Sequence, residues 1–126
     1  MRILLILFPL IFCNSILGQA IKKNKTFYPD STLKSVHIFQ KGNKKSYQKY
    51  FYTNGQIKSE GWLNDNQKNE IRISYHKNGV IKSQGLYYKG LKIDWWKYYN
   101  VKGEKIKEGY YRENFKDGYW KYYKNN

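Results

Sequence analysis

Lysines set between aromatic rings are the residues of this sequence best suited to binding. A Trp-Lys-Tyr triplet occurs twice, 24 residues apart, in a chain of formal net charge +15 that is 19% aromatic. Rings that stack on bases beside lysines that contact phosphates can hold single-stranded nucleic acid. The same combination suits anionic lipid and protein partners. The binding residues predicted on this basis are Trp96, Lys97, Tyr98, Trp120, Lys121 and Tyr122.

Residue types that carry catalysis form no recognisable constellation. His37 and His76 stand in different sequence contexts and lack the paired spacing of a metal site. Glu60 and Glu108 each precede a glycine, which makes them pattern positions of a repeat rather than an acid/base pair. Serine recurs at 24-residue intervals, as a structural position does. We therefore expect no enzyme, no catalytic residue, no cofactor and no metal.

A 24-residue register organises the chain. Glycines recur at 55, 79 and 103 and again at 61, 85 and 109, and a ring recurs at 51, 75, 99 and 123. The register gives units 28–51, 52–75, 76–99 and 100–123, the first of which is degenerate because it lacks both glycines. A repeat of this period is typical of stacked supersecondary units.

Each unit has the pattern of two short strands. Asn54-Gly55 and Asn78-Gly79 favour tight turns because both residue types accept positive φ. Alternation along a strand puts Lys121 on one face and Trp120 on the other. The sequence predicts an all-β fold: an elongated, twisted antiparallel sheet of successive β-hairpins. It leaves open which face is more buried.

The units resemble a known repeat family. Residues 52–62 and 115–123 are similar to MORN repeats of the variant found in YwqK-type antitoxin-like proteins, with an Asn-Gly turn and a later Asp-Gly-x-Trp-x-Tyr-Tyr phrase. The resemblance implies a sheet of successive hairpins used as a scaffold. Unit 52–75 departs from it, because Glu70-Ile71-Arg72 stands where unit 100–123 has glycine, tyrosine and tryptophan.

The first twenty residues have the pattern of a secretory signal peptide. Arg2 precedes an apolar run over 4–12, and Gly18 and Ala20 are small residues suited to cleavage. We expect a signal helix in 1–20, a basic leader over 21–27 and a repeat domain over 28–126. A retained membrane anchor is the alternative.

The single cysteine bears on lipidation. Cys13 follows Phe12, whereas a lipoprotein signal places a small residue before its cysteine. We therefore expect an exported protein, in the periplasm, the cell envelope or the medium, without a lipid anchor.

These observations favour a non-enzymatic protein-binding or scaffolding module with an unknown protein partner. Two alternatives remain open, a binder of anionic membrane or envelope polymer and an antitoxin-like neutraliser of a protein toxin. Export argues against a nucleic-acid partner. Exposed sheet edges would also permit edge-to-edge self-association.

Overall fold

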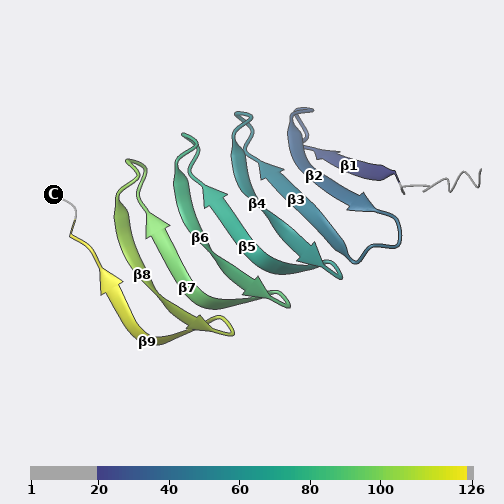
Figure 1. The fold of residues 1–126 in the computed structure, drawn as a ribbon. Coiled ribbons are helices and arrows are strands. Elements are labelled where there is room, and N and C mark those ends of the chain that lie inside the picture. Colours follow the sequence, from purple (N-terminus) through teal and green to yellow (C-terminus); the bar gives the residue numbers. More distant parts are fainter. Residues whose placement is uncertain (1–19, 125–126) are drawn as a thin grey trace, which may run out of the picture.

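The computed structural model describes residues 20–124, which form one sheet of nine antiparallel strands paired in chain order. Figure 1 shows the strands following one another across the sheet, with β1 and β9 as the two edges. This confirms the predicted all-β architecture of successive hairpins; the predicted signal helix lies outside the described residues. The strands are β1 (Ile21–Phe27), β2 (Leu33–Gln40), β3 (Lys45–Phe51), β4 (Ile57–Asn64), β5 (Gln67–Tyr75), β6 (Ile81–Tyr88), β7 (Leu91–Tyr99), β8 (Lys105–Arg112) and β9 (Phe115–Tyr122).

The basic segment before the repeats belongs to the sheet. The sequence predicts a basic leader over 21–27 ahead of the repeat domain, but Ile21–Phe27 forms β1 and pairs with β2 from Ile21↔Gln40 onward. Every residue of β1 is exposed. The backbone ladder therefore places this strand without burial of its side chains, which is why hydrophobic patterning did not reveal it. No helix in residues 20–124 is long and apolar enough to cross a membrane.

The turns between units are built by the expected asparagine and glycine. Gly55 adopts φ +86° and donates its N–H to the carbonyl of Tyr52. The Asn54 side chain accepts from the N–H of Gln56 at 3.0 Å, which satisfies a turn donor locally.

Hydrogen bonds between residues 23 apart in the sequence link each of these turns to the next, and we call these hydrogen bonds the clasps. The hydroxyl of Tyr28 donates to the carbonyl of Phe51, and Tyr52 donates in the same way to Tyr75. The Asn54 amide likewise donates to the carbonyl of Lys77. Successive units are therefore fixed by turn contacts as well as by strand pairing.

A bulge recurs at one position of the later units. Glu70, Asp94 and Gly118 stand 24 residues apart and adopt φ of 61°, 61° and 63°. Each lies where the pairing with the preceding strand shifts register. Two extra residues stand on the later strand at each shift and twist it locally, whereas β2 and β3 pair through the corresponding part of the degenerate unit without a shift.

Little of this single-layer sheet is fully buried. Leu63 and Trp96 are the buried apolar side chains of the described residues. Both lie on the face that also carries Ser59, Arg72 and Tyr87, which we call the groove face. The other face, with Glu60 and Glu108, is the opposite face.

Candidate functional site

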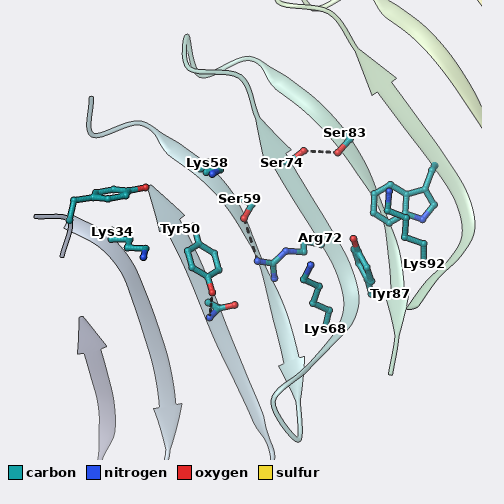
Figure 2. A pocket seen from close by; sticks show the side chains of 13 residues that line it. Lys34, Tyr50, Lys58, Ser59, Lys68, Arg72, Ser74, Ser83, Tyr87 and Lys92 are labelled. Atoms are coloured by element: carbon teal, nitrogen blue, oxygen red, sulfur yellow. Dashed lines mark hydrogen bonds between the residues drawn. The ribbon is translucent and has the colours of Figure 1, made fainter. Parts of the chain in front are cut away.

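The groove face is hollowed across β2 to β7. The hollow encloses about 470 Å³ and is lined by thirteen side chains, five of them cationic. Figure 2 shows these cations on several strands around the hollow, with Arg72 and Lys68 side by side near its centre. We call this the groove; its lining comprises Tyr28, Lys34, Gln48, Tyr50, Lys58, Ser59, Lys68, Arg72, Ser74, Ser83, Tyr87, Lys92 and Trp96.

The hollow exists because unit 52–75 has smaller or thinner side chains where later units have rings. Trp96 and Tyr98 of β7 pack at a centroid distance of 6.2 Å. The corresponding residues of β5 are Arg72 and Ser74. The Ser74 hydroxyl is hydrogen-bonded to that of Ser83 at 2.5 Å, so nothing bulky rises from the sheet at this point.

Arg72 lies at the centre of the groove and is only 7% exposed. Its stem packs on Gly61, where an added Cβ would meet Arg72 Cγ at 3.0 Å. Nη2 donates to the hydroxyl of Ser59 at 3.3 Å, and the guanidinium carbon lies 6.0 Å from the centre of the Tyr50 ring. Nη1 is buried without a hydrogen-bond partner in residues 20–124. An unsatisfied buried donor on a charged group is costly, and burial also lowers the pKa of Arg72.

A row of lysines covers rings beside Arg72. Lys68 lies 5.1 Å from the centre of the Tyr87 ring, and Lys92 lies 4.5 Å from that of Trp96. Lys116 continues the row, 4.4 Å from Trp120 beyond the groove. Burial lowers the pKa of Lys68, and the charges of Arg72 and Lys92 lower it further. Like charges are thus held close together on one face.

The carboxylates that form ion pairs do so with cations outside the groove. Five ion pairs join side chains within residues 20–124, and none uses a cation of the groove. Glu60 pairs with Lys49 at 3.5 Å, and Glu108 pairs with Lys105 at 3.1 Å, both on the opposite face. The groove lining itself contains no aspartate or glutamate. Its positive charge is therefore not offset locally.

Tyrosine hydroxyls hold the carboxylates of the opposite face. Tyr75 donates to Glu60 at 2.7 Å, and Tyr123 donates to Glu108. Burial, followed by the bond and charge of Glu60, raises the pKa of Tyr75 to about 12. The hydrogen bond from Tyr123, assisted by Trp95, holds the pKa of Glu108 down to about 2. These acids are engaged in the scaffold.

The structure divides the predicted binding residues between the two faces. Trp96 lines the groove at 3% exposure. Tyr98 and Trp120 pack in the neighbouring aromatic cluster, which Lys116 joins to Tyr122 by a hydrogen bond of 2.8 Å. The two lysines of the set, Lys97 and Lys121, alternate with these rings and lie on the opposite face.

Sequence reasoning missed Arg72 and the row of lysines. Both carried a usable signal, since lysine recurs at 44, 68, 92 and 116 in the 24-residue register. Arg72 was visible as a departure from the repeat, but its burial and its unpaired nitrogen depend on the packing of several strands.

The opposite face carries an exposed apolar stripe. Trp95 stands across from Tyr110, and Ile71 across from Leu86, so the side chains continue from hairpin to hairpin. We call these residues the stripe; its exposed members are Trp62, Ile71, Trp95, Tyr110 and Tyr119.

Comparison with known proteins gives little for this chain. No family model and no curated protein matches it. A crystal structure of TarM matches with 12% identity and a TM-score of 0.46. An S. aureus TarM mutant in complex with Fondaparinux, alpha-GlcNAc-glycerol and UDP matches with 14% identity and a TM-score of 0.48. Each match covers 71% of this chain and only 19% of the TarM chain. At TM-scores below 0.5 the likeness supports no conclusion about this chain.

Proposed function

We propose that this chain is an exported, non-enzymatic binding module that holds an anionic polymer in the groove, on a scaffold of MORN-like repeats. The observation that carries the proposal is the collection of five cations in one hollow without a carboxylate. A bound polyanion would supply the missing countercharge and would relieve the repulsion between neighbouring cations.

The shape of the groove favours a slender polymer over a flat membrane. Arg72 and Trp96 are recessed, at 7% and 3% exposure. Since neighbouring strands lie about 4.8 Å apart, the hollow extends over about 24 Å from β2 to β7. A planar lipid surface can approach the outer lysines but cannot reach the recessed guanidinium.

The packing of the rings argues against single-stranded nucleic acid. Trp96 makes T-shaped contacts with Tyr87 and Tyr111, with centroid distances of 5.2 and 6.0 Å. The indole packs on Gly85, and Lys92 lies over the ring. Binding of bases by stacking needs a free ring face, and this ring is already covered by protein.

Titration calorimetry with polyanions tests the proposal. We expect inorganic polyphosphate or dextran sulfate to bind the full chain, with an affinity that falls steeply as salt screens the charges. Lys68→Gln/Lys92→Gln should weaken binding by at least about tenfold. The matched control Lys97→Gln/Lys121→Gln removes the same charge from the opposite face and should bind nearly as the wild type does.

Two outcomes would overturn this assignment. Equal weakening by both double variants would mean that net charge alone attracts the polymer. Binding to vesicles of acidic phospholipid, with none to either polymer, would replace the polymer by a membrane surface.

The stripe favours a second function, the capture of a protein partner on the opposite face. Exposed aromatic side chains are strong anchors in protein interfaces, and Lys97 lines a shallow hollow together with Ile71 and Trp95. A partner with apolar side chains inside an acidic surround would fit this chemistry.

Partner recovery from native envelope extract tests this second function. A partner should be captured by the wild type and by Lys68→Gln/Lys92→Gln, and lost with Ile71→Ser/Tyr119→Ser. The second function would be rejected if the partner were lost with Lys68→Gln/Lys92→Gln and kept with Ile71→Ser/Tyr119→Ser.

A further inference from the structure

The centre of the groove is built differently from its rim. Lys34 and Lys58 are exposed lysines that contribute charge, whereas Arg72 is buried with Nη1 unsatisfied. Exposed charges attract a polyanion without fixing any one group of it. A recessed guanidinium with an unsatisfied donor can bind a particular anionic group in a defined orientation.

Donors of three kinds line the groove around Arg72. Ser59 accepts a hydrogen bond from Arg72 Nη2 at 3.3 Å, which leaves its hydroxyl hydrogen to donate. Lys68 and Tyr87 line the groove beside Arg72 (Figure 2). These donors come from β4, β5 and β6, so they approach the centre of the groove from different directions.

We infer that Arg72, with Ser59 and Lys68, binds one phosphate or sulfate group of the polymer. A tetrahedral oxyanion offers three or more oxygens spread over different directions, whereas a carboxylate offers two in one plane. The spread of donors therefore matches the oxyanion better. This inference rests on the proposed function, since it names the chemical class of the groove's ligand.

The row of lysines can contact further anionic groups along the polymer. Lys68, Lys92 and Lys116 stand on alternate strands, which spaces them by about 10 Å along the sheet. Anionic groups that repeat at regular short intervals can meet successive lysines while one of them occupies the Arg72 site. Inorganic polyphosphate and dextran sulfate have such repeated groups and are suitable probes.

The repeat itself supplies the variant that tests the site. Arg72→Trp introduces the residue that stands at the equivalent positions 96 and 120, where the indole packs on Gly85 and Gly109. Gly61 occupies the same place beneath Arg72. Arg72→Trp should therefore fold, and Lys97→Gln is a control that removes one positive charge from the opposite face.

Calorimetric titrations of the full chain with polyphosphate, dextran sulfate and polyglutamate give the readout. The wild type should prefer polyphosphate or dextran sulfate to polyglutamate, and the stronger of those two identifies phosphate or sulfate as the preferred group. Arg72→Trp should weaken binding of the preferred polymer by about tenfold or more and reduce that preference, while Lys97→Gln should not. Arg72→Lys keeps the charge but loses the planar guanidinium, so it too should lose the preference. This variant replaces Arg72→Trp in the test if Arg72→Trp does not fold.

The possible failures are distinguishable. If the wild type binds none of the polymers, the proposed function falls and this inference falls with it. If the wild type binds them and both Arg72 variants bind equally well, the groove function stands and the Arg72 site is rejected. If polyglutamate binds as tightly as the others and depends equally on Arg72, the oxyanion class is rejected.

Discussion

In the β6–β7 hairpin, Trp96 packs on Gly85 and Tyr98 lies beside it, whereas in the β4–β5 hairpin Arg72 packs on Gly61 and Ser74 lies beside it. Both hairpins use the same glycine position, the same bulge and the same strand pairing. Only the side chains that stand on this frame differ. The comparison shows how a repeat can keep its backbone and change one unit from a structural unit into a candidate binding unit.

Removing the side chain at the shared position, 96 or 72, should give the largest difference in stability between the two hairpins. Trp96→Ala should lower the free energy of unfolding by about 3–5 kcal/mol, because it deletes a buried indole and leaves a cavity. Arg72→Ala should cost less than about 1 kcal/mol, since it also removes a buried unpaired donor. Urea denaturation of both variants checks this, and equal losses would contradict the division of roles.

Adding a methyl group beneath that side chain should give the next largest effect. A Cβ on Gly85 would lie 2.2 Å from the Trp96 indole, while one on Gly61 would lie 3.0 Å from the Arg72 stem and from the carbonyl oxygen of Ile71. Gly85→Ala should cost about 3 kcal/mol and Gly61→Ala about 1 kcal/mol, because only the first forces a rigid ring to move. The same denaturation series measures both, and a larger loss for Gly61→Ala would show that the arginine is held more rigidly than the indole.

Filling the groove should make the β4–β5 hairpin resemble the β6–β7 hairpin. Ser74→Tyr introduces the residue found at 98 and 122, and it should occupy the space beside Arg72. We expect polyphosphate to bind about tenfold more weakly with little change in unfolding, as measured by calorimetry and urea denaturation. Unchanged binding would show that the ligand does not enter the hollow at Ser74.

The smallest expected effect on stability comes from Glu108 on β8, whose equivalent on β6 is the amide Gln84. Glu108 accepts a hydrogen bond from Tyr123, and at the equivalent position Gln84 donates to the Tyr99 hydroxyl at 3.4 Å. The pKa of Glu108 is lowered from 4.5 to about 2 in the fold. Protons therefore bind the unfolded chain more readily, and this stabilisation is present above pH 4.5 and is lost as the pH falls toward 2.

Acid titration of stability checks that sign. Glu108→Gln should flatten the fall in the free energy of unfolding between pH 4.5 and 2, by less than about 1 kcal/mol because solvent screens this site. Gln84→Ala should leave the slope unchanged, because the amide does not titrate. An unaltered slope in Glu108→Gln would assign the acid sensitivity to other carboxylates such as Glu60.

Much of the fold could be read from the sequence, because the 24-residue register and the Asn-Gly turns encode strand order and pairing locally. The strand at Ile21–Phe27 could not, since all its side chains are exposed and only its backbone is paired. The left-handed φ of Glu70 and Asp94 was equally hidden, because glycine stands at this position only at Gly118. Local patterns thus predicted the ladder but not its edge or its bulges.

The candidate site was less accessible to sequence reasoning. Alternation correctly separated Trp120 from Lys121, but it could not show which face is hollowed. The triplets place a lysine next to rings in the sequence, whereas the lysines that contact those rings in the fold, Lys92 and Lys116, come from the turn ends of the same strands. The charge of Arg72 was visible in the sequence, and its isolation from carboxylates required the packed sheet.

The clasps between turns bear on how a chain of this kind can lengthen. Each clasp takes a backbone carbonyl as its acceptor, as when His76 contacts Tyr99 at 2.9 Å and Asn78 donates to Val101 at 2.8 Å. Every residue type supplies such an acceptor, so a tandem duplication of residues 76–99 would meet a ready partner at each new junction. Genetic duplication of one unit should therefore give a longer sheet at once, without compensating substitutions, and a denaturation midpoint no lower than that of the parent would show it.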